Sequence, residues 1–386
     1  MKILYDHQIF TIQEFGGISK CFCEYIKHRP IGVDYEIATI ESNNEHLRCS
    51  GLFPRLKPIS SMNRVEFCKK LPFRGNSRLF DLFCLIPWFN PAEKINRRES
   101  KKAIKLRDYD VFHPTFFDDY YLPYLKGKPF VLTIHDMMPE LFPQYFGAND
   151  FQIVQKRKLV KYADIIVAIS QNTKDDIVRI LGVPEEKVKV VYLGGPERED
   201  INEKPLVPGQ YILYMGTRDL YKNFMQTLVD FAEFQKEHKS VKLVCTGTPF
   251  KTSELCQIEK LGISDQVLHM HASDHEVKNL YAHAIAFIYP SLYEGFGMPI
   301  LEAFAYGCPA LLNNKSCFPE IAGDAAMYFD SEEGHSNLPQ VLNCLINMSQ
   351  QERLELIEKG YERLKLFTWE IRSAQLCQIY QSLIKK

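Results

Sequence analysis

The sequence predicts an α/β protein built from doubly wound parallel sheets. Short apolar runs without polar alternation recur along the chain, a pattern typical of strands that are buried on both faces of a parallel sheet. Segments with helical spacing separate these runs, so strands and helices alternate. The 386 residues are enough for two domains, each with its own core.

Composition and charge are those of a soluble globular protein, with 46% hydrophobic and 25% charged residues. No stretch approaches the roughly 18 to 20 uninterrupted apolar residues of a membrane-spanning helix, and residues 1–10 contain no cleavable apolar core. We therefore expect a cytoplasmic protein. Eleven cysteines are scattered without a Cys-x-x-Cys pair, which favours reduced core thiols over disulfides or zinc.

The first half of the chain contains predicted strands at residues 2–5, 35–40, 111–114, 130–134, 165–169 and 188–192. Gly16 and Gly17 follow the first strand and directly precede a predicted helix that ends near Lys27. Paired glycines at a strand-to-helix turn allow a substrate to approach the backbone. A tight turn without a ligand is the alternative explanation.

His135 and Asp136 come directly after the apolar strand at 130–134. They should therefore emerge at the carboxyl edge of the sheet, where open α/β sheets bind their ligands. An imidazole at this edge can position a hydroxyl group or help to stabilise charge. From its position alone, His135 could equally be a structural histidine.

Residues 54–107 form a basic segment that is rich in aromatic side chains. Between Arg55 and Arg107 there are fourteen Lys or Arg residues and four acidic ones, although the whole chain has a formal net charge of -1. Large apolar residues are interleaved with these charges: Phe67, Phe73, Phe80, Phe83, Trp88 and Phe89. This mixture predicts peripheral contact with an anionic membrane, and no nucleic-acid-binding motif accompanies it. A solvated insertion whose aromatic residues pack inward is the alternative.

A second domain is predicted after residues 196–209, a polar and proline-containing stretch that reads as a linker. Its strands are expected at residues 211–215, 242–246, 267–270, 284–289, 310–312 and 326–329. Helical patterns fill the intervals between these strands and continue to the C-terminus. The second domain is therefore expected to repeat the architecture of the first.

The loop after the strand at 211–215 contains Gly216, Arg218, Lys222 and Asn223 and leads into a helix. Arginine offers a bidentate fork and lysine a point charge, so the two together can clamp a diphosphate. A charged surface loop is the alternative. Gly247, which follows the next strand, is a second position where a ligand can approach the backbone.

Residues 291–307, SLYEGFGMPILEAFAYG, combine a strand exit, a glycine loop and a helix start. We expect the helix to begin near Pro299 and to end at Gly307, because proline suits the first helical position and glycine the end. Glu294 then lies in the loop and Glu302 in the early turns of the helix.

The same stretch has the chemistry to bind a nucleotide sugar. Gly295 and Gly297 leave the backbone uncovered, and free amide groups at a helix start favour an anion such as a diphosphate. Carboxylates at this place can accept hydrogen bonds from sugar hydroxyls. An acidic loop followed by an ordinary amphipathic helix is the alternative.

These residues resemble the signature of the family-4 retaining glycosyltransferases, which have the GT-B fold. The resemblance is carried by Glu294, seven intervening residues and Glu302 within YEGFGMPILEAFAYGCP, and by PEIAGDAAMYFD after them. It covers most of the chain, with the region from about residue 54 to 107 as the main exception. The segment HDMMPELFP, which begins at His135, resembles a sub-group that includes bacterial mannosyltransferases of polysaccharide assembly.

The resemblance implies two Rossmann-like domains that face each other across a cleft. Residues 1–195 would form the acceptor-side domain, 196–209 the linker and 210–366 the nucleotide-sugar-binding domain. Residues 367–386 would form a helix that packs back on the first domain. The resemblance also implies a retaining enzyme that requires neither a metal nor another cofactor.

In such an enzyme Glu294 would bond the hydroxyls of the donor sugar and Glu302 the ribose, while Arg218 and Lys222 would neutralise the departing diphosphate. The donor-binding set implied by the match is Gly216, Arg218, Lys222, Asn223, Gly247, Glu294, Gly295, Phe296, Gly297, Met298 and Glu302. The acceptor-side set is Gly16, Gly17, His135 and Asp136, with His135 also expected to take part in catalysis.

The sequence therefore predicts transfer of a sugar from a nucleotide donor to a glycan or a lipid-linked saccharide in polysaccharide synthesis. The sub-group favours mannose from GDP-mannose over a UDP-sugar, and action in the cytoplasm, peripherally at the inner face of the membrane. A nucleotide-sugar epimerase or phosphorylase on the same fold is one alternative. A non-catalytic sugar-binding protein with two doubly wound lobes is another, which the Arg218 and Lys222 pair disfavours.

Overall fold

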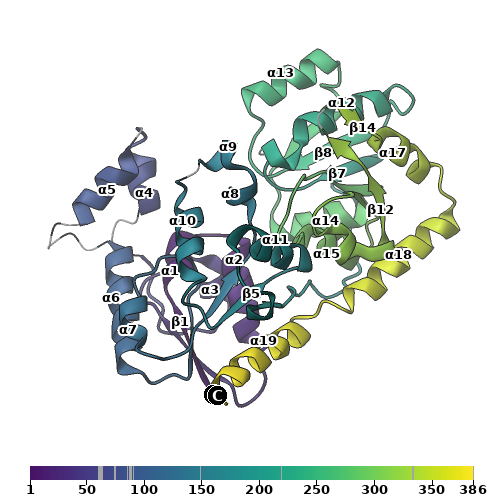
Figure 1. The fold of residues 1–386 in the computed structure, drawn as a ribbon. Coiled ribbons are helices and arrows are strands. Elements are labelled where there is room, and N and C mark those ends of the chain that lie inside the picture. The colour runs from purple at the N-terminus through teal and green to yellow at the C-terminus, as the bar shows by residue number, and fades with distance from the viewer. Residues whose placement is uncertain are drawn as a thin grey trace. The chain divides into compact units, whose positions relative to one another are not determined.

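The computed structural model describes residues 1–59, 64–73, 75–84, 86, 89, 91–147, 149–218, 220–332 and 334–385, and it divides into two compact units (Figure 1). The first unit contains Met1–Ile169, Thr173–Tyr192 and Trp369–Lys386. The second contains Ser170–Asn172 and Leu193–Thr368, so residues 196–209 group with it. The C-terminal helix belongs to the first unit.

The strands of the first unit are β1 (Lys2–Asp6), β2 (Asp34–Ala38), β3 (Val111–His113), β4 (Val131–Ile134), β5 (Ile165–Ala168) and β6 (Val188–Val190). Its helices are α1 (Gln8–Ile12), α2 (Gly17–Lys27), α3 (Glu45–Cys49), α4 (Arg64–Lys70), α5 (Asn76–Cys84), α6 (Ala92–Leu106), α7 (Leu122–Leu125), α8 (Met138–Leu141), α9 (Pro143–Phe146), α10 (Phe151–Leu159), α11 (Gln171–Leu181), the 3-10 helix η1 (Glu185–Lys187) and α19 (Trp369–Ile384).

The parallel strands of the first unit follow the order β2-β1-β3 and then β4-β5-β6. A parallel bridge between Phe112 and Phe130 places β3 beside the chain that enters β4. The strand order therefore reverses between β1 and β3. Ligands of open α/β sheets bind beside the carboxyl ends of the strands at such a reversal, so this edge is where a ligand of the first unit is expected.

Both faces of this sheet are buried, which explains why its strands show no polar alternation. On one face, side chains of the strands pack with those of the covering helices in an apolar cluster that includes Leu4, Leu132, Ile166, Ile104 of α6 and Leu159 of α10. On the other face, the ring of Phe22 in α2 lies edge-on against Tyr5 at a centroid distance of 6.0 Å.

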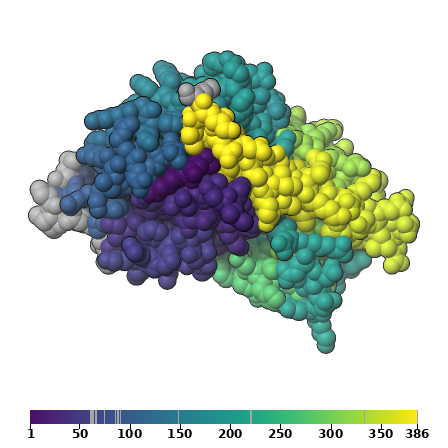
Figure 2. Space-filling view, turned by 90° about the horizontal axis from the view of Figure 1, so that it is seen from below, coloured from purple at the N-terminus to yellow at the C-terminus, as the bar shows by residue number. Residues whose placement is uncertain are grey.

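The C-terminal helix α19 is joined to the first unit by a buried chain of hydrogen bonds. The hydroxyl of Tyr380 lies 2.6 Å from Nδ1 of His113 and 3.2 Å from the hydroxyl of Tyr5. Nε2 of His113 lies 2.8 Å from Oγ1 of Thr133. Because buried polar groups need such partners, this chain fixes the position of the helix more tightly than apolar contact alone. Figure 2 shows α19, in yellow, against the purple N-terminal segment.

Helices α4 and α5 pack against each other and project from the sheets of the first unit (Figure 1). The ring centroid of Phe67 lies 5.3 and 5.7 Å from those of Phe80 and Phe83, and that of Phe89 lies 6.0 and 5.8 Å from the same two. Leu71, Phe73 and Leu82 remain 43%, 48% and 60% exposed. Part of the aromatic content of the basic segment therefore packs inward and part faces solvent. Trp88 lies outside the described residues.

The strands of the second unit are β7 (Tyr211–Tyr214), β8 (Lys242–Thr246), β9 (Val267–Met270), β10 (Ala286–Tyr289), β11 (Ala310–Asn313), β12 (Ala326–Phe329), β13 (Ser331–Glu332) and β14 (His335–Ser336). Its helices are the 3-10 helix η2 (Leu220–Lys222), α12 (Phe224–Gln235), α13 (Thr252–Leu261), α14 (Asp274–His283), α15 (Met298–Ala305), α16 (Phe318–Ala322), the 3-10 helix η3 (Gly323–Ala325), α17 (Leu338–Ile346) and α18 (Gln350–Leu364).

The main sheet of the second unit is parallel and has the order β12-β11-β10-β7-β8-β9. The order reverses between β7 and β10, the central pair, with Ile288 opposite Tyr214. One face packs with α12, α13 and α17 in a cluster that includes Ile212, Leu243, Ile288, Phe231 and Leu342. On the other face Tyr281 of α14 lies edge-on to Phe287 at 5.4 Å. Within the described ranges, no helix of either unit is long and apolar enough to span a bilayer.

The first unit should lose stability as the pH falls below about 6.5. Burial lowers the pKa of His7 and His113 to about 3 and that of His135 to about 4. Between about pH 6.5 and 4 the unfolded chain therefore binds protons that the folded chain does not. The free energy of unfolding therefore decreases as the pH is lowered through this range. The raised pKa of buried Asp6 opposes this effect in part.

We expect the Tm to be level from pH 8 to 6.5 and to fall steadily from pH 6.5 to 4.5. His113→Asn should flatten this slope, because it removes one of the titrating groups, even though it lowers the Tm at neutral pH. Thermal unfolding at five pH values checks both statements. A Tm that does not change between pH 6.5 and 4.5 would contradict them.

Candidate active site

An ion pair joins two loops at the centre of the second unit. Lys222 ends η2, after β7, and Glu294 lies in the loop after β10; their Nζ and Oε1 atoms are 2.5 Å apart. The backbone amide of Leu292 also donates to the carbonyl of Tyr221 at 2.8 Å. Both charged side chains are largely buried, with 15% and 12% of their surface exposed. The strand reversal thus holds a cation and a carboxylate together at the carboxyl edge.

The loop that contains Glu294 is supported from the neighbouring strand. After β11, Ser316 adopts a left-handed conformation with φ of 55°, and its hydroxyl donates to the Glu294 carbonyl at 2.8 Å. Oγ of Ser316 also accepts a hydrogen bond from the Glu294 amide at 3.2 Å. The thiol of Cys317 donates to the carbonyls of Glu294 and Phe296 at 3.2 and 3.1 Å. The backbone of the glycine loop is therefore fixed before any ligand arrives.

Helix α15 begins directly after this loop, one residue before the expected Pro299. Gly297 precedes the first helical residue, Met298, with φ of 93°, and a Cβ there would lie 3.0 Å from Ile300. Glycine is thus required at this position. Glu302 lies within α15, as predicted, and its Oε2 accepts from the hydroxyl of Tyr281 at 3.3 Å.

Gly216 and Gly247 bring the loops after β7 and β8 into contact. Gly247 has φ of 99°, and a Cβ there would lie 2.7 Å from the Gly216 carbonyl oxygen. The close approach at Gly247 is therefore to another loop of the protein. Asn223 precedes α12 in a left-handed conformation, with φ of 56°, and its Nδ2 donates to Oγ of Ser331 at 3.0 Å.

Arg218 is placed differently from the open clamp that the sequence predicts. Its side chain is 1% exposed and pairs with Glu254, whose Oε2 lies 3.0 Å from Nε. The guanidinium also donates to the carbonyls of Thr246 at 3.3 Å, Thr248 and Pro249 at 2.8 Å. Of the predicted pair, Lys222 therefore lies beside Glu294, while Arg218 lies beneath the loop after β8.

In the first unit, His135 and Asp136 follow β4 at the carboxyl edge, as expected. Nε2 of His135 is buried and has no hydrogen-bond partner among the residues that the structure describes. Burial lowers the pKa of His135 to about 4; the charge of Asp136 opposes this shift and that of Lys156 adds to it. The imidazole is therefore neutral at physiological pH and can exchange a hydrogen bond with a hydroxyl.

A buried ion pair supports this turn. Lys156 of α10 donates to the carbonyl of Asp136 at 2.8 Å and to Oε2 of Glu140 at 3.0 Å. Both side chains are 1% exposed. Removing one member alone would leave an uncompensated buried charge, which costs about 3–5 kcal/mol. The pair therefore fixes the backbone that positions His135.

Gly16 and Gly17 lie at the start of α2, after α1, and Gly16 precedes the first helical residue. A Cβ at Gly16 would meet the side chain of Gln13, whereas nothing lies within 4 Å of the corresponding point at Gly17. Both glycines follow β1 in the chain, on the side of its carboxyl end. At that end buried Asp6 accepts hydrogen bonds from the amide of Thr115 at 2.9 Å and from its hydroxyl at 2.7 Å.

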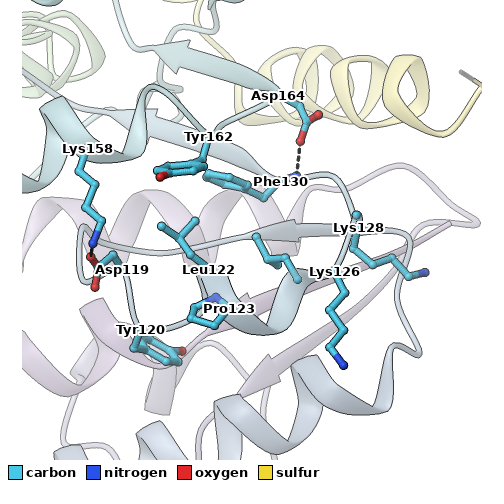
Figure 3. A pocket seen from close by; sticks show the side chains of 12 residues that line it. Asp119, Tyr120, Leu122, Pro123, Lys126, Lys128, Phe130, Lys158, Tyr162 and Asp164 are labelled. Carbon is cyan, nitrogen blue, oxygen red and sulfur yellow. Dashed lines mark hydrogen bonds and ion pairs between the residues drawn. The ribbon is translucent and has the colours of Figure 1, made fainter.

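The cavity of about 650 Å³ in Figure 3 lies elsewhere in the first unit. Phe130 and Asp164, which line it, come immediately before β4 and β5, so it adjoins the amino ends of these strands. Lys158 is paired there with Asp119, and Lys126 and Lys128 lie at the other side of the apolar floor (Figure 3). This cavity is thus not the predicted site.

Several supporting residues were not found from the sequence. Ser316 and Cys317 follow the strand at 310–312, so the rule that selected the other carboxyl-edge loops could also have selected them. The carboxylate of Glu254 accepts a hydrogen bond from the Lys251 amide, three residues earlier, at 2.8 Å, but Lys251 is not a helix-capping residue type, so no sequence signal selects this position. Lys156 lies in a segment with helical spacing, and that spacing does not predict its buried ion pair with Glu140. In the described part of the chain, no group of three or more His, Cys, Asp or Glu residues is placed to hold a metal ion.

Comparison with known families agrees with this geometry. Residues 66–195 match glycosyltransferase family 4, and residues 197–363 match the glycosyl transferases group 1. The second match contains the whole carboxyl edge described for the second unit, including Lys222 and Glu294.

Relatives and solved structures extend the match. The chain is 27% identical over 301 residues to O-antigen chain mannosyltransferase B of Escherichia coli, covering 73% of this chain and 77% of that protein. It is 27% identical over 216 residues to O-antigen chain mannosyltransferase RfbU of Salmonella typhimurium, covering 56% and 60%. It is 26% identical over 230 residues to the GDP-mannose:cellobiosyl-diphosphopolyprenol alpha-mannosyltransferase of Xanthomonas oryzae pv. oryzae, covering 57% and 60%. The chain thus spans less than two thirds of the last two relatives.

Among solved structures, Alr3699/HepE of Anabaena in complex with UDP-glucose has a TM-score of 0.69 at 17% identity, covering 99% of this chain and 100% of that one. At this identity the likeness shows the fold alone. The fold is GT-B, with two Rossmann-like domains, as the sequence predicted.

Lys222→Ala should lower kcat/KM by a factor on the order of a hundred, because it removes a preorganised cation from the carboxyl edge. Lys222→Arg keeps a positive charge and should recover part of the loss. Lys315→Ala is the matched control, since Lys315 follows β11 at the same edge but pairs with exposed Glu332. Steady-state kinetics with saturating acceptor measures the effect. A Lys222→Ala enzyme with the turnover of the wild type would remove Lys222 from the mechanism.

Proposed function

The chain belongs to the glycosyltransferases of family 4 and group 1, and we propose that it transfers mannose from GDP-mannose, with retention, to a glycan or a lipid-linked saccharide. The observation that supports this donor is that relatives from three bacteria are mannosyltransferases, one of them named for GDP-mannose. Two of them are named for the O-antigen chain and one for a diphosphopolyprenol-linked saccharide, which supports the class of acceptor. With such an acceptor, the enzyme would act at the cytoplasmic face of the membrane.

The second unit would bind the donor. In the transfer, the bond between the sugar C1 and a diphosphate oxygen breaks and negative charge collects on the leaving diphosphate. Lys222 would neutralise that charge, an effect that is strongest in a largely buried site. Gly295, Phe296, Gly297 and Met298 would add backbone amides at the start of α15.

The two carboxylates would bind different parts of the donor. The carboxylate of Glu294 forms an ion pair with Lys222, the cation proposed to contact the diphosphate. Glu294 is therefore suited to accept hydrogen bonds from sugar hydroxyls next to the reacting centre. Glu302 lies further along α15 beside Tyr281, a position suited to the ribose. Neither is proposed as a nucleophile.

The first unit would bind the acceptor. A neutral imidazole at His135 can accept a hydrogen bond from the attacking hydroxyl or donate one to it, and Asp136, Gly16 and Gly17 belong to the same carboxyl edge. The pKa of His135 of about 4 keeps the imidazole neutral through the physiological range.

A panel of nucleotide sugars tests the proposal. GDP-mannose should raise the Tm more than other GDP- and UDP-sugars, because a ligand that binds only the folded state stabilises it. With acceptor present it should yield an α-linked mannoside, the configuration of the donor, and activity should persist in excess chelator. Preference for a UDP-sugar would overturn the proposed donor, and a β-linked product would overturn retention. Loss of activity in chelator that Mg²⁺ restores would overturn the independence of metal.

We also propose that α4, α5 and α6 contact an anionic membrane surface where a lipid-linked acceptor is found. A groove of about 1250 Å³ along α6 is lined by Lys94, Arg97, Arg98, Lys101, Lys102 and Lys105, with Glu99 as the acidic member of the lining. Exposed Leu71, Phe73 and Leu82 on the α4–α5 projection add apolar surface. Each cation near an anionic leaflet contributes about 1 kcal/mol, which salt screens.

The chain should therefore sediment with anionic vesicles at low salt and not with neutral ones. Changing Lys69, Lys70, Arg98, Lys101, Lys102 and Lys105 to Gln should abolish binding, because these positions combine the charge of α4 and α6. The control changes Lys236, Lys359 and Lys365, exposed lysines of the second unit, to Gln. Equal pelleting with both vesicle types, or no effect of the six changes, would leave residues 54–107 as a solvated insertion.

A further inference from the structure

The guanidinium of Arg218, at the carboxyl edge of the second unit, is almost fully hydrogen-bonded. Four of its five N–H groups are directed at Glu254 and at the carbonyls of Thr246, Thr248 and Pro249. The guanidinium carbon also lies 5.5 Å and 4.9 Å from the ring centroids of Phe224 and Phe250.

These contacts, which we term the Arg218 network, join two loops. Arg218 itself follows β7, and the three carbonyls follow or end β8. Glu254 comes from the first turn of α13, where its carboxylate also accepts from the Lys251 amide at 2.8 Å. The network therefore ties the chain before α12 to the chain before α13.

The loop residues around the network are exposed. Gly216, Thr217, Gly247, Thr248 and Pro249 are exposed, whereas Arg218 and Glu254 beneath them are 6% and 3% exposed. Gly247 lies so close to the Gly216 carbonyl that a Cβ would be 2.7 Å from it. A ligand at this edge would thus meet backbone groups whose positions Arg218 determines.

A direct bond from Arg218 to a phosphate would require this network to open. Glu254 would then keep a negative charge at 3% exposure without its cation, and such a charge is costly. The obstacle is smaller for Lys222, because the side chains of Lys222 and Glu294 are 15% and 12% exposed, against 1% and 3% for Arg218 and Glu254. The two cations of the predicted clamp are thus not equivalent.

We infer that Arg218 is a positioning residue for the donor nucleotide: with Glu254 it fixes the loops at 216–218 and 247–249, and it does not bind the diphosphate. The inference rests on the proposed function only in that a nucleoside diphosphate binds at this edge. The cation that contacts the diphosphate is then Lys222.

A double-mutant cycle separates the two roles of Arg218. The variants are Arg218→Met, Glu254→Met and the double change, and the probes are GDP and UDP titrated into the whole chain by calorimetry. If Arg218 acts through the loops, each single change weakens binding by about tenfold or more, and the double change is no worse than the worse single one. If Arg218 binds the diphosphate, Glu254→Met leaves the Kd unchanged or lowers it, which would overturn the inference.

Milder variants guard against loss of the fold. Arg218→Lys keeps the charge but not the fork, so it should weaken binding nearly as much as Arg218→Met, whereas Glu254→Gln keeps an acceptor and should recover most of the affinity. Glu199→Met with Lys278→Met removes an exposed pair of the same unit and should leave the Kd unchanged. The acceptor KM should not move in any variant.

Hydrogen exchange without nucleotide tests the inference independently of the proposed function. A peptide spanning residues 247–254 should exchange faster in Arg218→Met than in the wild type, while a peptide from β10 should not change. Equal exchange at 247–254 would overturn the network as a positioning device. A wild type that binds neither GDP nor UDP, with faster exchange in the variant, would instead overturn the proposed function and retain the loop-fixing role of Arg218.

Discussion

The parallel pairing of β7 with β10 is the constraint on which the candidate donor site depends. These strands are neighbours in the sheet although 72 residues separate Lys222 from Glu294. Because both strands run the same way, the loops that follow them leave the sheet at the same edge, at the point where the strand order reverses. The cation and the carboxylate lie 2.5 Å apart because β7 and β10 are parallel neighbours in the sheet.

Side chains that support the edge lie beneath the loops they hold; Cys317 and Arg218 are buried and Ser316 is half-buried. Ser316 and Cys317 bond to the backbone of the glycine loop, and Arg218 bonds to the loop after β8. This arrangement leaves glycine and backbone groups at the surface. Glycine loops on their own are permissive and costly to order, whereas loops already bonded from below lose little further freedom when a ligand binds. Preorganisation of this kind is what a site that stabilises developing charge needs.

The fold was predictable from the sequence because its strands are short, apolar and buried on both faces. Strand positions agree with the structure to within one or two residues: the run at 242–246 is β8, and that at 188–192 is the slightly shorter β6. Lys222, Glu294 and His135 were assigned to the carboxyl edge by the same periodicity and by family resemblance. The pairs that support the two edges, Arg218 with Glu254 and Lys156 with Glu140, were not predictable, since they form across loops whose course no local pattern determines.

The two units differ in the side chains they place at their carboxyl edges, a difference that suits the proposed transfer of a sugar. The second unit keeps buried charges paired, as in Arg218 with Glu254 and Lys222 with Glu294. The first unit also pairs buried Lys156 with Glu140, but burial keeps its imidazoles His113 and His135 neutral. A leaving diphosphate gains negative charge and is stabilised by a fixed cation, whereas an attacking hydroxyl is best oriented by a neutral group that both donates and accepts. Exchanging these environments would serve neither role, because an unpaired cation beside the hydroxyl would weaken it as a nucleophile.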